Sequence, residues 1–224
     1  MDELRDWLRF YQDLGIGEIR LGAGAARAAG APSRPKGEVL AEWASCVATC
    51  TKCRLHAEGR AQTVFADGGP GAELMFVGEG PGAEEDRRGI PFVGRAGQLL
   101  TKIIEDGMKM RRADVYIANI VKCRPPGNRT PRPDEIDACM PYLHKQIEIV
   151  DPKVVVALGA PAANALLGAS LPITRIRGRF RDFRGRLLMP TFHPAYILRN
   201  PAKKRELWQD VKKVMAKLRE RAGR

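Results

Sequence analysis

Short apolar runs alternate with longer amphipathic stretches along the chain from residue 38 onward. Four runs are short enough to be strands, and they span residues 74–77, 115–121, 154–158 and 187–192. Between and after them, apolar residues recur every three or four positions, as on one face of a helix, at 99–104, 136–147 and 207–218. Asn200 and Pro201 are predicted to cap and open the last of these helices. The alternation predicts an α/β fold, a three-layer α/β/α sandwich with a central parallel four-stranded sheet.

The first 37 residues have a different pattern. Their apolar residues at helical spacing predict a short amphipathic helix, formed by Leu4, Trp7, Leu8, Tyr11 and Leu14. Residues 22–37 contain almost only Gly, Ala, Pro and basic residues, a composition typical of flexible linkers. We therefore predict an arm at residues 1–37, with a possible replication or repair protein as its partner, and a main domain at 38–224.

The chain is strongly basic, with 38 Lys and Arg against 26 Asp and Glu and a net charge of +12. This charge favours a polyanionic partner, of which nucleic acid is the foremost class. The longest apolar stretch, residues 154–169, is interrupted by Gly159, Pro161 and Asn164 and is too short to cross a bilayer. The acidic N-terminus lacks the pattern of a secretion signal. We expect a cytoplasmic monomer with no membrane partner.

Polar residues follow the predicted strands where each one ends. Gly78, Glu79 and Gly80 follow the first strand, Asn119 lies near the end of the second, and His193 follows the fourth. Ligands of parallel sheets bind at the carboxyl ends of the strands, so these residues are expected at one rim. The glycines formally match G-x-G-x-x-G/A, but the next strand lacks the acidic residue that a dinucleotide site requires. The glycines instead allow a flat ligand to approach the backbone.

Five cysteines suggest a metal site. Cys50 and Cys53 form a C-x₂-C pair, and Cys123 and Cys139 could complete four thiolates, which suit zinc or an iron–sulfur cluster. A redox dithiol or a chance pairing would give the same spacing, and Cys139, on the inward face of its helix, could be a core thiol. Cys46 is interpreted as a free thiol near the site.

Two basic or apolar segments suggest contacts with a nucleic acid. The arginines of the first alternate with other residues, as in a strand with one arginine face, at Arg175, Arg177, Arg179 and Arg181. Such a face would contact phosphates or form a solvated sheet edge. The second segment, Ile197, Leu198 and Arg199, follows His193 where a wedge or phosphate clamp would act on a duplex.

Three segments resemble the family 4 uracil-DNA glycosylases, which carry a [4Fe–4S] cluster. They are GEGPGAEEDRRGIPFVGRAGQLL, NIVKCRPPGNRTPRPDEIDAC and TFHPAYILRNP. The resemblance runs from about Cys50 to the C-terminal helix and implies an α/β/α sandwich. It also implies a [4Fe–4S] cluster with four ligands: Cys50, Cys53, Cys123 and Cys139. The activity it implies is excision of uracil from DNA by a monofunctional glycosylase that leaves an abasic site.

The same resemblance implies roles for single residues. Glu79 and Gly80 would line the uracil pocket, Phe92 would stack on the base, Asn119 would read its edge, and His193 would contact a uracil carbonyl. Asn128 corresponds to a residue suspected of helping catalysis. Family members often have alanine where Gly80 stands. A covalently trapping relative carries a basic, His-containing insert near Asn128; the chain has none, so we expect turnover.

These residue types suit N-glycosidic cleavage, which leaves positive charge on the sugar and negative charge on uracil. His193 would donate to the uracil oxygen, and Glu79 would position or deprotonate water and oppose the cation. The alternative class is a non-catalytic iron–sulfur DNA-binding module. A redox protein would need neither the pocket residues nor the basic charge.

Overall fold

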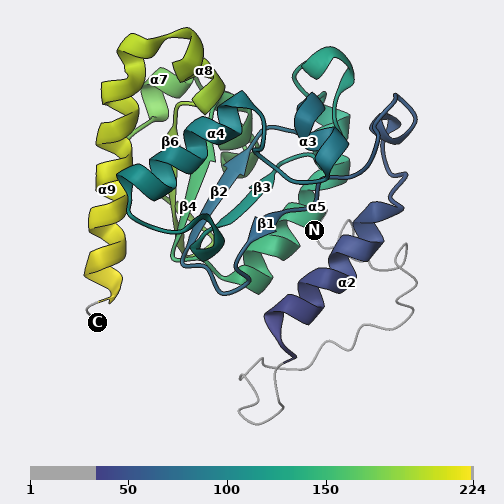
Figure 1. Ribbon diagram of the computed structural model, residues 1–224, viewed down its shortest axis with the longest axis horizontal. Coiled ribbons are helices and arrows are strands. Elements are labelled where there is room, and N and C mark those ends of the chain that lie inside the picture. The colour runs from purple at the N-terminus through teal and green to yellow at the C-terminus, as the bar shows by residue number, and fades with distance from the viewer. Residues whose placement is uncertain (1–33, 223–224) are drawn as a thin grey trace. The chain divides into compact units, whose positions relative to one another are not determined.

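The structure is a computed structural model that describes residues 34–222 (Figure 1). The predicted amphipathic helix at residues 4–14 lies outside the described residues, as does most of the predicted linker. The described chain opens with helix α2 (Lys36–Ala48), so the last two residues assigned to the linker, Lys36 and Gly37, are helical. One compact unit begins at Lys36.

A six-stranded sheet forms the centre of this unit, in the order β1-β3-β2-β4-β6-β5. Its strands are β1 (Asp67–Gly68), β2 (Leu74–Gly78), β3 (Tyr116–Asn119), β4 (Val154–Leu158), β5 (Arg181–Phe183) and β6 (Arg186–Thr191). The four central strands are parallel, and β1 and β5 pair antiparallel at the two edges. The predicted α/β class is confirmed. The sheet has six strands where four were predicted, because β1 and β5 are too short to produce an alternating pattern.

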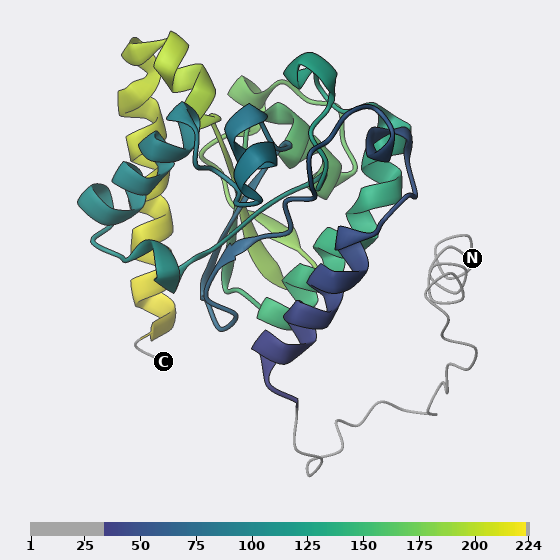
Figure 2. The same cartoon turned by 45° about the vertical axis from the view of Figure 1, so that its right-hand side comes forward.

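Helices cover both faces of the sheet (Figures 1 and 2). On one face, α4 (Arg95–Lys102) and the C-terminal helix α9 (Lys204–Ala222) enclose a core that includes Phe76, Val156 and Val211. On the other face lie α5 (Pro133–Val150) and, packed against it, α2. All residues of β2, β3 and β4 are buried, which explains why these strands are continuous apolar runs.

Short helices and single turns connect these elements. The helices are α3 (Ala83–Arg88), α6 (Ala160–Leu167), α7 (Ile173–Ile176) and α8 (Pro194–Arg199). The turns are η1 (Arg54–His56), η2 (Ile103–Gly107), η3 (Arg112–Asp114), η4 (Pro126–Asn128) and η5 (Pro201–Lys203). Pro201 opens η5, which continues into α9. Asn200 occupies the predicted N-cap position, but its side chain makes no capping bond, because its amide donates instead to the Tyr196 carbonyl of α8.

The order of the strands determines where a ligand can bind. From β2 the chain crosses to β3 on one side and then returns to β4 on the other side of β2. The connections therefore leave β2 and β4 in opposite directions. The carboxyl ends of these two strands, here called the crevice, are where open parallel sheets bind their ligands. Glu79 follows β2, Gly159 follows β4, and Phe192 and His193 follow β6. Among the described residues, no helix is both long and apolar enough to span a membrane.

Candidate active site and thiol cavity

Gly78, the last residue of β2, lets two side chains approach each other at the crevice. It is paired in register with Asn119, the last residue of β3. A Cβ at Gly78 would lie 2.4 Å from Phe92 Cζ and 2.5 Å from Asn119 Oδ1. No larger residue fits between them, so the glycine allows Phe92 and Asn119 to border the same space.

Phe92 is held in an unusual backbone conformation. Its φ is 54°, in the left-handed region, which costs a non-glycine residue about 1–2 kcal/mol. The carboxylate of Glu85, on α3, accepts hydrogen bonds from the next two amides, Val93 N at 2.9 Å and Gly94 N at 2.8 Å. The sequence prediction missed Glu85. Its position three residues after Gly82, where α3 begins, is the pattern that could have indicated it.

His193 is the N-cap of α8 and has the extended backbone expected before a proline. Its Nδ1 accepts a hydrogen bond from Ala195 N at 3.1 Å. Burial, aided by the charge of Arg199, lowers the pKa of His193 to about 4, so the ring is neutral at pH 7. Because Nδ1 is the acceptor, the proton of the neutral ring is on Nε2. The ring centroid lies 5.6 Å from that of Phe92, so a neutral ring that carries an N–H donor lies next to the phenylalanine.

The side chain of Asn119 is buried, with 1% of its surface exposed. Its Oδ1 has no hydrogen-bond partner within the part of the chain that the structure describes. Buried polar atoms are nearly always hydrogen-bonded, so an unpaired amide oxygen at a crevice indicates an acceptor for a ligand.

Glu79 and Gly80 line the turn that follows β2. Burial raises the pKa of the Glu79 carboxyl, and a hydrogen bond with the Thr130 side chain partly offsets this shift. Gly80 packs closely: a Cβ there would lie 2.8 Å from Val121 Cγ2. Alanine at this position would therefore require Val121 to move.

Asn128 differs from the other predicted site residues in its surroundings. It ends η4 on the loop between β3 and α5, it is exposed, and its φ is 56°. Its Oδ1 accepts a hydrogen bond from Arg124 Nε at 2.9 Å. The structure thus brings Phe92, Asn119 and His193 together and holds Asn128 on a neighbouring loop.

The prediction of a single arginine face is wrong. Residues 173–176 form α7, and Gly178 has a φ of 71°, so the expected alternation is broken. Arg177 points inward, where it pairs with Asp210 at 2.8 Å and lies 4.7 Å from the Phe192 ring centroid. The other three are exposed: Arg175, Arg179 and Arg181.

Only part of the predicted wedge is accessible. Ile197 is 3% exposed and packs with Phe192 and Leu207, so it cannot enter a duplex. Leu198 is 41% exposed and Arg199 is also exposed.

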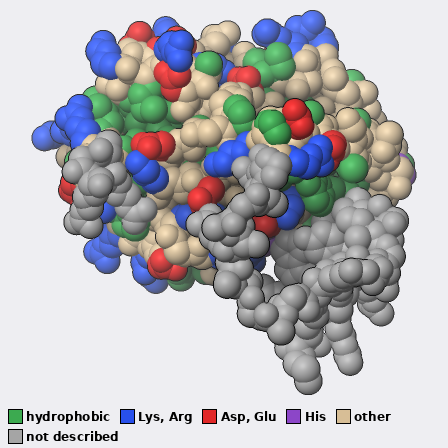
Figure 3. Space-filling view, turned by 90° about the horizontal axis from the view of Figure 1, so that it is seen from below, with side chains coloured by type: hydrophobic (Ala, Val, Ile, Leu, Met, Phe, Trp, Pro, Cys, Tyr) green, Lys and Arg blue, Asp and Glu red, His purple; other side chains and the backbone are tan. Residues whose placement is uncertain are grey.

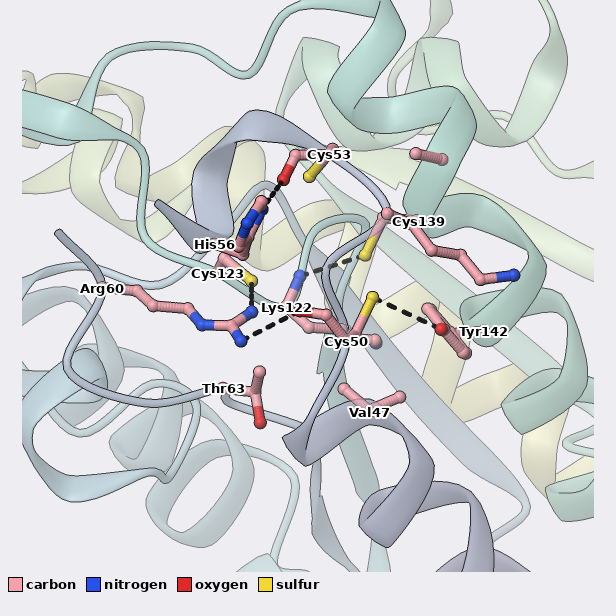
Figure 4. A pocket seen from close by; sticks show the side chains of 12 residues that line it. Val47, Cys50, Cys53, His56, Arg60, Thr63, Lys122, Cys123, Cys139 and Tyr142 are labelled. Atoms are coloured by element: carbon pink, nitrogen blue, oxygen red, sulfur yellow. Dashed lines mark hydrogen bonds between the residues drawn. The ribbon is translucent and has the colours of Figure 1, made fainter. Parts of the chain in front are cut away.

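The four predicted ligand cysteines line one cavity (Figure 4), which measures about 290 Å³ when its open mouth is included. They come from four places in the chain: Cys50 follows α2, Cys53 precedes η1, Cys123 follows β3, and Cys139 lies in α5. Cys46, on α2, is exposed and is not among the residues that line the cavity.

Hydrogen-bond donors point at three of the four sulfur atoms. Arg60 Nη1 donates to Cys123 Sγ at 2.9 Å, Lys122 N to Cys139 Sγ at 3.3 Å, and the Tyr142 hydroxyl to Cys50 Sγ at 3.4 Å (Figure 4). Such donors stabilise thiolate ligands. The sequence prediction missed all three residues, since only the folded chain brings Arg60 to these sulfurs.

Burial raises the pKa of three of these thiols, Cys53, Cys123 and Cys139, the last to about 12. The thiolate form therefore needs a positive charge in the cavity, as a bound metal centre would provide. Within residues 34–222, no three metal-binding side chains are close enough to hold one metal ion. Four thiolates are a ligand set that suits either zinc or an iron–sulfur cluster.

The chain is similar in sequence to known uracil-DNA glycosylases. The family model of the uracil DNA glycosylase superfamily matches residues 65–212. The type-4 uracil-DNA glycosylase of Thermotoga maritima is 48% identical over 171 residues, which cover 75% of this chain and 88% of the relative. The type-4 enzyme of Sulfurisphaera tokodaii is 44% identical, over 75% of this chain and 80% of the relative. A type-5 uracil-DNA glycosylase of Pyrobaculum aerophilum is 32% identical over 58% of this chain.

The α/β sandwich described above is thus that of the uracil DNA glycosylase superfamily. Within it, the chain belongs to the type-4 uracil-DNA glycosylases, as the extent and identity of the type-4 matches show. The family expected from the three sequence motifs is confirmed.

Proposed function

We propose that this protein removes uracil from DNA by hydrolysing the N-glycosidic bond, as a monofunctional glycosylase that leaves an abasic site for base excision repair. The observation that carries the proposal is the unpaired, buried Oδ1 of Asn119, which borders the same space as Phe92. A polar acceptor beside an aromatic ring suits a flat base that carries a donor on its edge.

Asn119 is proposed to select uracil. Its Oδ1 would accept from uracil N3–H, and its amide would donate to O4. Cytosine presents an amino group instead of O4 and an acceptor instead of N3–H, so both contacts would fail. Phe92 would stack on the extruded base, which is worth about 1–3 kcal/mol. Glu79 and Gly80 would line the remaining side of the pocket.

Cleavage requires groups that stabilise both products of the bond break. The neutral Nε2–H of His193 would donate to the uracil oxygen on which negative charge develops. Glu79 would position or deprotonate the attacking water and oppose the positive charge on the sugar. Asn128, on the adjoining loop, is proposed to assist catalysis.

The DNA substrate must bring its base out of the stack, or be single-stranded, to reach the crevice. Leu198 and Arg199 follow the His193 cap and are exposed, so they are proposed to wedge and grip the backbone.

On the face seen from below (Figure 3), Lys and Arg side chains alternate with Asp and Glu among the described residues. That face lies away from the proposed DNA-binding rim, at the opposite ends of the strands.

The four cavity cysteines, Cys50, Cys53, Cys123 and Cys139, are proposed to hold a [4Fe–4S] cluster. Their common cavity and the hydrogen-bond donors that point at three of their sulfurs support this choice. When bound, the cluster would supply a covalent cross-link between the segment after α2 and helix α5. The base-excision steps described above use only side chains of the protein.

The proposed setting is a cytoplasmic monomer. The five cysteines are all unpaired with one another, which suits a reducing compartment. Residues 1–37 are proposed as the arm that contacts a replication or repair protein.

The activity is tested by incubating the cluster-loaded protein with end-labelled DNA that contains one uracil, followed by alkaline cleavage. His193→Ala, Glu79→Gln and an exposed control, Arg181→Ala, are run alongside. We expect strand cleavage at uracil that falls about 10²- to 10³-fold in His193→Ala and by a similar factor in Glu79→Gln. The control should retain wild-type activity. Tight DNA binding without cleavage would instead identify a binding module.

A further inference from the structure

Lys122 is the one lysine among the largest fully buried side chains of the described chain, with 1% of its surface exposed. It lies between the end of β3 and the cluster-site residue Cys123. Burying an ammonium group is costly unless hydrogen bonds and an opposite charge compensate for the lost water. The groups around Lys122 must therefore supply these hydrogen bonds and this opposite charge.

The ammonium of Lys122 makes two hydrogen bonds, both to neutral groups. It donates to the carbonyl oxygen of Asn119 at 2.8 Å and to Gln146 Oε1 at 2.5 Å. Its Nζ lies 5.9 Å from the centroid of the Phe65 ring. No carboxylate pairs with it within residues 34–222, so its positive charge is balanced by something other than an acid.

Lys122 also contacts the cavity that the four cysteines line. Its backbone N–H donates to Cys139 Sγ at 3.3 Å, and it is itself one of the residues that line the cavity (Figure 4). Four thiolates around a cluster carry net negative charge, and this charge is the one close enough to offset the ammonium.

The rest of the network holds strand β3 at both ends. The Gln146 amide donates to the hydroxyl of Tyr116, the first residue of β3, at 3.2 Å and to Phe65 O at 3.1 Å. Lys122 itself holds Asn119, the last residue of β3. The Lys122 ammonium, the Gln146 amide and the Tyr116 hydroxyl each have at least one partner in this network, which favours a single conformation of the buried groups.

We infer that Lys122 is a positioning residue that couples the thiol cavity to base recognition. Its ammonium holds the backbone of Asn119, so that the side-chain amide faces the base, and supplies the counter-charge of the four thiolates. The inference rests on the proposed uracil-excising function and adds a residue to it. The inference is argued from the hydrogen bonds and the burial of Lys122.

The test compares the cluster-loaded full chain with Lys122→Met, which keeps the length of the side chain and removes its charge. Lys145→Met is the matched control. It removes the charge of a lysine next to Gln146 on α5, but Lys145 pairs with the exposed Glu148 and not with the network. Three quantities are measured: KM and kcat for uracil-containing DNA, the inhibition constant for free uracil, and the reduction potential of the cluster.

We expect Lys122→Met to raise KM and the uracil inhibition constant about 10- to 100-fold, the loss expected for a charged hydrogen bond, with a smaller change in kcat. The cluster potential should fall, since a nearby positive charge favours the reduced state. Lys145→Met should change none of these. A loaded Lys122→Met protein with an unchanged uracil constant overturns the inference, and so does an unchanged potential.

A second variant keeps the inference testable if Lys122→Met does not fold or does not retain iron. Gln146→Glu preserves the ammonium and an acceptor for it while it adds a negative charge. We expect a lower cluster potential and a uracil inhibition constant within about threefold of wild type, since the bond to Asn119 remains. An unchanged potential contradicts the inference. If wild-type protein fails to excise uracil, the proposed function fails, whereas the potential still tests the counter-charge.

Discussion

The rings of His193 and Phe92 lie with their centroids 5.6 Å apart and their planes inclined by 31°. One ring follows β6 and the other follows α3, so the contact joins both sides of the crevice. The residue proposed to donate to the base and the residue proposed to stack on it therefore border one space. A substitution at either residue is therefore expected to change the position of the other ring.

The neutral state of His193 makes protein stability depend on pH. Its pKa is about 4 in the folded chain against 6.5 for an ordinary histidine, so only the unfolded chain takes up a proton between these values. The free energy of unfolding is therefore expected to fall as the pH drops from about 6.5 towards 4. Urea unfolding at pH 7 and pH 5 measures this fall. It should be smaller in His193→Asn, and an identical fall in both proteins would contradict the prediction.

Substitutions at two neighbouring residues of α8 should have different effects, one on stability and the other on excision from duplex DNA. Ile197→Ala should lower the free energy of unfolding by about 2–5 kcal/mol, because Ile197 is buried against Phe192 and Leu207. Leu198→Ala should change it by less than about 0.5 kcal/mol. Leu198→Ala is instead expected to slow excision from duplex DNA several-fold and to leave excision from single strands unchanged. Equal rates on duplex DNA for wild type and Leu198→Ala would exclude the wedge.

The proposed cluster can be tested by substituting one cysteine that lines the cavity and one that does not. Cys123→Ser should abolish the visible absorbance of the cluster and lower the melting temperature, because Cys123 lines the cavity and bonds to Arg60. Cys46→Ser should leave both unchanged, since Cys46 is exposed and does not line the cavity. Absorbance spectra, iron analysis and thermal melts of the two variants provide the measurement. Full iron content in Cys123→Ser would show that the ligand set is wrong.

Two arginines on the same segment should differ in what they contribute. Arg177→Leu leaves the buried Asp210 carboxylate without its ion pair, which is expected to cost about 3–5 kcal/mol of unfolding free energy. Arg175→Leu, at an exposed position, should cost less than about 0.5 kcal/mol. Urea denaturation of both variants tests the pair. A small loss in Arg177→Leu would mean that Asp210 finds another partner.

The sequence predicted the central strands well because both faces of each are buried, so apolar residues run without interruption. The predicted second strand, 115–121, is longer than β3, which ends at Asn119. The reason is that Ile120 and Val121 remain apolar and still donate hydrogen bonds, to the carbonyls of Gly78 and Glu79 beyond the end of β2. Pattern alone does not distinguish such residues from a strand.

The positions of His193 and Asn119 at strand ends were predictable from the apolar runs that precede them, whereas their roles in the site stay predictions. Residues that act through contacts distant in sequence were not. Arg177 shows why: residues 173–176 are helical and Gly178 has a left-handed backbone, so the alternation of a strand does not give the direction of its side chain. Glu85 and Lys122 are ordinary charged residues in sequence, and only folding brings them to backbone groups of the pocket.

The order of the thiols in the chain has a consequence for the protein's synthesis. All four cysteines of the cavity occur at or before residue 139, whereas β6, His193 and α9 come after it. Because a chain leaves the ribosome from its N-terminus, all four of these cysteines emerge before His193 is made. A nascent chain that ends after α5 thus already carries the four proposed cluster ligands. Loading of the proposed cluster would therefore not have to await the strand that positions His193.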